Sequence, residues 1–241
     1  MLRRDYMLRF MFVMLSGCAL HLGAQEPAAQ THLAAVTARL APPHPASSQK
    51  LQKHAAAVIW LKPLRPGILP SVTPGNFTLM QKNKMFTPHL LAVPVGSSVS
   101  FPNADPFFHN VFSLFDGRRF DLGLYEAGTS RSVVFSREGV SYIFCNIHSE
   151  MSAVVISLAT PLYSSADAQG AFNLKGVPDG DYDLHVWIEG QKQSTLDRLT
   201  RRVHVTGELT DLGEISSGHP EERQHLNKFG QPYEPDNRPI Y

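Results

Sequence analysis

The feature that most constrains the fold is an alternation of apolar and polar residues that recurs along the chain in short runs. It is clearest between residues 168 and 187, where every second position is apolar in two runs: Phe172 and Leu174, then Tyr182, Leu184 and Val186. Successive side chains of a β-strand point to opposite faces of a sheet, so this pattern predicts strands with one buried face. Val177-Pro-Asp-Gly180 separates the two runs and is typical of a turn.

Further apolar runs, separated by turn residues, extend this pattern along most of the chain. They are Ala56–Leu61, Phe77–Gln81, Leu90–Val95, Val99–Phe101, Phe120–Tyr125, Ser132–Phe135, Ser141–Cys145, Ala153–Leu158 and Val203–Leu212. Thr160-Pro161 marks a boundary between two groups of runs. The sequence therefore predicts an all-β protein with one sandwich over residues 55–159 and a smaller one over residues 160–215.

The N-terminus has the pattern of an export signal. Arginines near the start, the apolar run Phe10–Leu22 and a small-residue cut after Ala24 predict a signal peptide over residues 1–24. Leu15-Ser-Gly-Cys18 also matches the lipobox of bacterial lipoproteins. Cleavage after Ala24 would release the protein, whereas lipidation of Cys18 would tether it to a membrane.

Two polar segments flank the predicted sandwiches. Residues 25–54 are rich in Ala, Pro, Gln, Ser and His, a composition that predicts a flexible linker. Residues 216–241 form a polar, proline-containing tail that is not expected to have a core of its own.

The chemistry concentrates in Tyr142-Ile-Phe-Cys-Asn-Ile-His-Ser-Glu-Met151. Cys145, His148 and Met151 are three residues apart, so one tight loop can direct a thiolate, an imidazole and a thioether toward one point. Sulfur ligands with imidazole suit copper, and two His with one Cys and a weak axial Met form a blue-copper site. Zinc is disfavoured because a thioether is a poor zinc ligand. The second imidazole is expected from His109, in the loop sequence 101–113.

The cysteine count supports a metal role for Cys145. The chain has two cysteines, Cys18 and Cys145. Cleavage after Ala24 removes Cys18, and processing at the lipobox lipidates it, so in both cases Cys145 has no partner for a disulfide in the folded part. A disulfide framework is therefore excluded. An unpaired thiol is a liability in an oxidising compartment unless its sulfur is occupied, and a copper ion would occupy it.

Residues 86–158 resemble a cupredoxin of the plastocyanin, amicyanin and pseudoazurin group. The resemblance rests on Phe86-Thr-Pro, Val95-Gly-Ser-Ser-Val-Ser-Phe, His109-Asn-Val, Gly139-Val-Ser-Tyr-Ile-Phe-Cys and His148-x-x-Met151, the last with amicyanin-like spacing. It implies a Greek-key β-sandwich with one mononuclear copper on His109, Cys145, His148 and Met151. It also implies that Asn110 ties the His109 loop to the Cys145 loop. An apolar shell that excludes water is expected from Phe107, Phe108, Phe112 and Phe144.

The second predicted sandwich has a resemblance of its own. Its pattern G-x-F-x-L-x-G-V-P-x-G-x-Y-x-L-x-V, from Gly170 to Val186, is similar to the carboxypeptidase regulatory-like, transthyretin-related module. That family implies an accessory or interaction role, and the segment shows no nucleophile or metal cluster. The whole arrangement resembles exported bacterial proteins of the methylamine-utilisation-like type, which implies a periplasmic location.

These patterns predict an exported electron carrier that is not an enzyme and whose partners are redox proteins such as oxidoreductases or cytochromes. The formal net charge of +1 and the absence of a basic stripe with interleaved aromatics disfavour nucleic acid. No small-molecule substrate is expected. Two alternatives remain open: a periplasmic copper chaperone, store or sensor, and a metal-free surface adhesion protein.

Overall fold

The computed structural model describes residues 32–41, 55–67, 69, 71–114, 117–216 and 226–233. Within these ranges the chain is almost entirely β-structure, as predicted, with one short helix, α1 (Gln193–Leu199). None of the described helical structure is long and apolar enough to span a membrane. The predicted signal peptide, with Cys18, lies outside the described residues.

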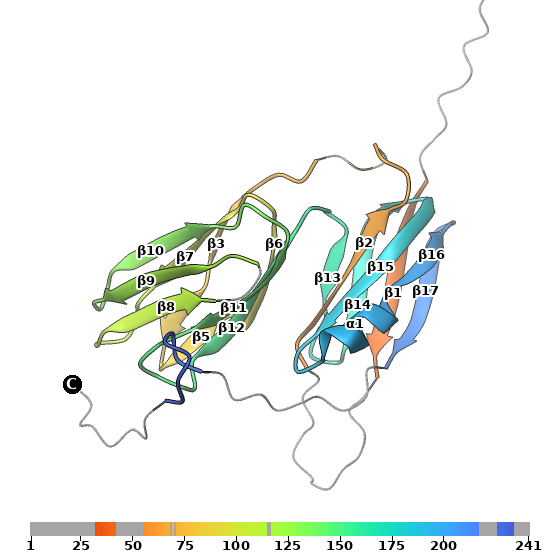
Figure 1. The fold of residues 1–241 in the computed structure, drawn as a ribbon. Helices are drawn as coiled ribbons and strands as arrows, with labels where there is room; N and C mark the ends of the chain where they lie inside the picture. Colours follow the sequence, from red (N-terminus) through yellow and green to blue (C-terminus); the bar gives the residue numbers. More distant parts are fainter. Residues whose placement is uncertain are drawn as a thin grey trace, which may run out of the picture. The chain divides into compact units, whose positions relative to one another are not determined.

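A first group of strands, the first module, runs from β3 to β12 (Figure 1). Its strands are β3 (Asn76–Thr78), β4 (Met80–Lys82), β5 (Met85–Thr87), β6 (Leu90–Pro94), β7 (Ser98–Pro102), β8 (His109–Ser113), β9 (Phe120–Tyr125), β10 (Ser130–Val134), β11 (Gly139–Phe144) and β12 (Ser152–Leu158). They form sheets in the order β10-β7-β3 and β6-β12-β11-β8-β9, with a separate β4-β5 hairpin. The core of this module contains both Cys145 and Met151.

A second group of strands, the second module, combines two early segments with the C-terminal strands. It consists of β1 (Leu33–Leu40), β2 (Ala57–Pro63), β13 (Tyr163–Ser165), β14 (Ala171–Pro178), β15 (Gly180–Ile188), β16 (Arg201–Val205) and β17 (Leu209–Ile215). The sheet orders are β14-β1-β17 and β13-β2-β15-β16. As the alternation predicted, Phe172, Leu174, Tyr182, Leu184 and Val186 are all buried in its core.

The prediction of a flexible linker over residues 25–54 is wrong for Leu33–Leu40, which forms β1. This strand pairs antiparallel with β14 and parallel with β17. Its alternate residues Ala34, Val36, Ala38 and Leu40 are buried. Alanine has weak strand propensity, so the segment's composition concealed a period of two that long-range pairing converts into a strand.

The predicted assignment of Ala56–Leu61 to the first sandwich also differs from the structure. The corresponding strand, β2, pairs antiparallel with β13 and β15. The apolar run identified a strand correctly, but alternation carries no information about which strand is its neighbour. The second module therefore draws on residues well before the expected boundary at Thr160.

Strand β12 serves both cores. Ala153 and Val155 pack in the core of the first module, whereas Val154, Ile156 and Leu158 belong to the core of the second. A strand buried on both faces appears in sequence as a nearly continuous apolar run. This strand also begins immediately after Met151, so the end of the candidate metal loop is anchored in rigid structure.

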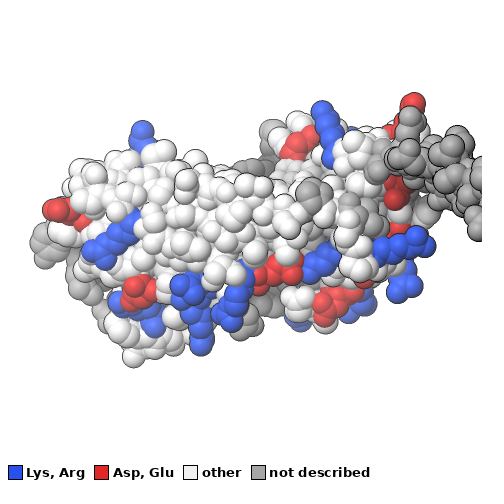
Figure 2. Space-filling view, turned by 90° about the horizontal axis from the view of Figure 1, so that it is seen from above, with Lys and Arg blue, Asp and Glu red and all other residues white. Residues whose placement is uncertain are grey.

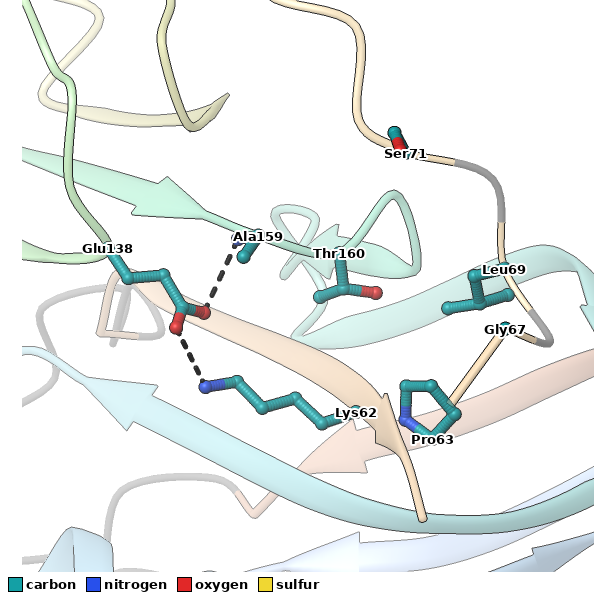
Figure 3. A pocket seen from close by; sticks show the side chains of 8 residues that line it. All are labelled: Lys62, Pro63, Gly67, Leu69, Ser71, Glu138, Ala159 and Thr160. Atoms are coloured by element: carbon teal, nitrogen blue, oxygen red, sulfur yellow. Dashed lines mark hydrogen bonds and ion pairs between the residues drawn. The ribbon is translucent and has the colours of Figure 1, made fainter. Parts of the chain in front are cut away.

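The described surface carries charges of both signs (Figure 2) and a pocket lined by polar and apolar residues. Positive and negative side chains are interspersed along one side of the view in Figure 2. A shallow pocket near Lys62 and Glu138 is drawn in Figure 3, and none of its lining residues is a His or Cys. Glu138 already accepts a hydrogen bond from the Ala159 backbone N–H at 3.3 Å and pairs with Lys62 Nζ at 3.0 Å.

Candidate metal centre

The loop from Cys145 to Met151 joins two neighbouring strands of the five-stranded sheet. Cys145 directly follows β11 and Met151 directly precedes β12, which pairs antiparallel with β11. The Cys145 N–H donates to the Met151 carbonyl at 3.2 Å, and the Met151 N–H donates to the His148 carbonyl at 3.1 Å. These bonds close a compact loop, as the three-residue spacing predicted.

Sheet pairing brings His109 to this loop from far away in the sequence. His109 is the first residue of β8, which lies beside β11 through the pair Phe112 and Phe144. The Cys145 sulfur is 3.8 Å from His109 Nδ1 and 3.7 Å from His148 Nδ1. The three donor atoms all lie within 4.8 Å of one another. The structure therefore brings together three of the four predicted donors.

These separations fit one metal ion bound by all three donors. Metal–sulfur and metal–nitrogen bonds of about 2.3 and about 2.0 Å, at about 120°, place sulfur and nitrogen about 3.7 Å apart. A tetrahedral angle with the same bonds gives about 3.5 Å. The observed 3.8 and 3.7 Å are compatible with both values, so one ion can bind the sulfur and both imidazoles at once.

Met151, the fourth predicted donor, lies at the end of the same loop. Its side chain is fully buried and packs in the core that contains Cys145. A thioether held in an apolar core is available to a soft metal but bonds weakly to zinc. Its burial suits the weak axial position that the sequence assigned to it.

The surroundings of Cys145 favour the thiolate. Burial opposes ionisation, but the hydrogen-bond contacts with His109 and His148 and the backbone N–H groups of Asn110 and Ile147 outweigh it. Together they lower the pKa of Cys145 to about 6. The thiolate is the form that binds metal, so this sulfur is ready to act as a ligand at neutral pH.

Aromatic residues shield the two imidazoles, as expected for Phe107 from the sequence. Its ring centroid lies 5.2 Å from that of His109 and 5.6 Å from that of His148. Phe112 and Phe144, also expected in this shell, are buried and pack on each other at 5.8 Å. Phe108 instead points outward and is 56% exposed, so it leaves an apolar side chain at the surface beside His109.

Asn110 lies where the resemblance placed it, between the two loops. Its side-chain oxygen accepts from the Asn146 N–H at 3.2 Å, and its amide donates to Asp121 at 2.8 Å. Lys228 closes a ring of bonds, because its N–H donates to the Asn146 side chain at 3.0 Å and its Nζ lies 2.8 Å from Asp121. This ring fixes the Cys145 loop against β8 and β9.

The C-terminal segment 226–233 therefore reaches the metal loop. Besides the Lys228 contacts, the Tyr233 hydroxyl donates to the Cys145 carbonyl at 2.8 Å. Burial, reinforced by the nearby Cys145 charge, raises the pKa of Tyr233 to about 12, so the hydroxyl keeps its proton. The sequence predicted a polar tail without a core of its own, with residues 225–233 against a domain surface, and the contacts of residues 226–233 agree with this.

Sequence reasoning missed five residues around the centre, namely Asp105, Asp121, Asn146, Lys228 and Tyr233. A signal existed for the first, since it lies four residues before His109 and carboxylates commonly orient metal-binding histidines. No comparable signal existed for Lys228 and Tyr233, because their contacts join residues more than eighty positions apart.

Comparisons with known proteins assign no family to the chain. No protein-family model matches the chain, and no curated protein matches it. Among solved structures, it is similar to a purple cupredoxin from Nitrosopumilus maritimus, with 24% identity, a TM-score of 0.31 and coverage of 34% of this chain and 98% of that one.

Two other solved structures are similar over a comparable share of the chain. A reduced amicyanin mutant is 20% identical, with a TM-score of 0.33 and coverage of 36% of this chain and 86% of that one. A copper-containing nitrite reductase from Thermus scotoductus is 22% identical, with a TM-score of 0.34, and the match covers 40% of this chain but only 25% of the reductase. The assignment of a metal therefore rests on the geometry of this chain.

Proposed function

We propose that this protein binds one copper ion through His109, Cys145 and His148, with Met151 as weak axial ligand, and carries single electrons as an exported type 1 copper protein. The observation that supports this best is the near-equal separation of the Cys145 sulfur from the two imidazole nitrogens, 3.8 and 3.7 Å. Bound copper would supply one-electron redox chemistry. The protein itself would convert no small-molecule substrate.

The protein's contribution is to hold one donor geometry. His109 belongs to a strand, and the loop that carries the other donors is anchored by β11 and β12 at its two ends. A donor set that does not rearrange suits both Cu(I) and Cu(II), and so limits the reorganisation that slows electron transfer. Phe107, packed against both imidazoles, helps to exclude water from the donors.

We propose redox proteins, such as cytochromes or larger oxidoreductases, as the partners. His109 is fully buried, whereas His148 is only partly buried, so His148 is the ligand closest to a docked partner. Ile147, 47% exposed, and Phe108, 56% exposed, place apolar side chains beside the two imidazole ligands in the sequence. Scattered apolar groups of this kind suit a brief contact better than a permanent interface.

The test is the visible and EPR spectrum of the purified protein loaded with Cu(II). One copper per chain and an intense thiolate-to-copper band are expected. Changing Cys145 to Ser should abolish the band, because an alcohol cannot replace the thiolate donor. Thr206→Ser, a change to serine at an exposed residue of the second module, is the control and should leave the spectrum unchanged. A band that survives Cys145→Ser would disprove the assignment, and so would stoichiometric zinc that copper cannot displace.

The same preparation separates an electron carrier from a copper chaperone, store or sensor. A carrier should pass through repeated reduction and oxidation without losing metal. It should also give up copper slowly to a competing chelator. Rapid transfer of copper to an acceptor, together with metal loss on each redox cycle, would favour the alternative function. A protein that binds no stoichiometric copper would favour an adhesion role.

We further propose a periplasmic location, supported by the signal-like pattern over residues 1–24. Intact-mass spectrometry of the native protein tests this proposal. A mature N-terminus near Gln25 would indicate release as a diffusing carrier. An N-terminus at Cys18 carrying acyl chains would indicate a lipid-anchored protein instead.

A further inference from the structure

A buried carboxylate stands directly behind one of the candidate ligands. Asp105, in the loop between β7 and β8, has a side chain only 5% exposed, and its Oδ2 lies 2.8 Å from Nε2 of the fully buried His109. Burying a charge costs several kcal/mol or more unless it is paired and hydrogen-bonded. A carboxylate in this position therefore needs further donors.

Those donors come from the hairpin turn between β4 and β5. The Asn83 N–H donates to Asp105 Oδ1 at 2.6 Å, and the Lys84 N–H donates to Oδ2 at 2.9 Å. Both turn residues have positive φ angles, 56° and 55°, as in the type I′ turns of two-residue hairpins. The turn thus directs two successive N–H groups at one carboxylate, although neither residue is a glycine.

The hydrogen bonds keep this carboxylate ionised. The backbone N–H groups of Asn83 and Lys84 donate to its two oxygens, and donors of this kind favour the charged form of a carboxyl group. An ionised carboxylate can only accept hydrogen bonds, so His109 must carry a hydrogen on Nε2. In a neutral imidazole the lone pair then lies on Nδ1, which is the atom 3.8 Å from the Cys145 sulfur.

We propose that Asp105 is a positioning residue that holds His109 in the metal-binding tautomer and stabilises Cu(II) relative to Cu(I), so that it lowers the reduction potential of the centre. This inference rests on the proposed copper function. A carboxylate bonded to the far nitrogen of a ligand imidazole fixes the ring and increases its donor strength. Its negative charge also favours the more highly charged metal ion.

The test compares Asp105→Asn with Glu126→Gln as copper-loaded full-length proteins. Both variants remove one negative charge from the first module. Glu126 is the control because its side chain is exposed and it is not one of the proposed metal ligands. Asp105→Asn should lower the ratio of Cu(II) to Cu(I) affinity at least tenfold, a rise in potential of about 59 mV for one electron. Glu126→Gln should change the ratio less than threefold. A folded, coloured Asp105→Asn protein with an unchanged or lower potential would overturn the proposal.

A second measurement needs no variant and so does not depend on how Asp105→Asn folds. In the diamagnetic Cu(I) wild-type protein, nitrogen NMR should show a hydrogen on Nε2 of His109 that exchanges slowly with water and is bonded to the Asp105 carboxylate. Coordination through Nε2, or rapid exchange of this hydrogen, would contradict the proposal. A wild-type protein without the thiolate-to-copper band would instead refute the proposed function.

Discussion

Replacing Asn110 by alanine tests whether the ring of hydrogen bonds around the Cys145 loop contributes to stability. The substitution removes the acceptor of the Asn146 N–H, at 3.2 Å, and a donor to Asp121, at 2.8 Å. A neutral hydrogen bond contributes about 1 kcal/mol and one to a charged group about 1.5–3 kcal/mol. The sum would be about 2.5–4 kcal/mol if both partners were left unsatisfied.

The structure places the expected value somewhat below that range. Asp121 keeps two other donors, Lys228 Nζ at 2.8 Å and the Gly123 N–H at 2.9 Å. Asn146 is only partly buried, so water can reach its N–H. We therefore expect Asn110→Ala to reduce the free energy of unfolding of the copper-free protein by about 2 kcal/mol.

Urea denaturation measures this value from the shift in midpoint at constant m. Asn76→Ala is the matched control, because Asn76 is exposed on β3 in the same module, and its expected effect is below about 0.5 kcal/mol. Copper should also leave the Asn110→Ala protein faster than the wild type, since the loop is less firmly held. Equal midpoints for the two variants would refute the role given to Asn110.

Three further predictions concern the axial ligand, the unexpected strand and the C-terminal segment. Met151→Leu should retain copper and colour but show a higher potential by voltammetry, because a weak donor to Cu(II) is lost; complete loss of copper would reject the axial role. Val36→Asp should lower the thermal midpoint strongly, since the Val36 side chain is fully buried in β1. Leu33→Asp, at a position 60% exposed, should be tolerated. Equal effects of the two variants would contradict the burial of this strand. Tyr233→Phe removes one hydrogen bond to the Cys145 carbonyl, which is worth about 1 kcal/mol. In a chelator assay it should accelerate copper release about fivefold. An unchanged rate would mean that residues 226–233 do not hold the Cys145 loop.

The candidate site could be predicted largely from sequence because its main part is local. The spacing of Cys145, His148 and Met151 requires only a short loop between two strands, and β11 and β12 provide it. His109 could be predicted because the cupredoxin pattern places a histidine immediately before Asn110. Asp105 was missed because its role depends on the Asn83-Lys84 turn, whose contact with it joins positions more than twenty residues apart.

The sequence by itself determined that the chain is β-structured, because a period of two is a local property that each strand displays in its own residues. Which strands become neighbours was decided only in three dimensions. β1 and β2 lie more than a hundred residues before their partners β14 and β15, and β1 was hidden in an alanine-rich segment. The path of the tail to Cys145 is likewise set by tertiary contacts. Alternation specifies the buried face of a strand, whereas its partner is selected by the packing of the whole core.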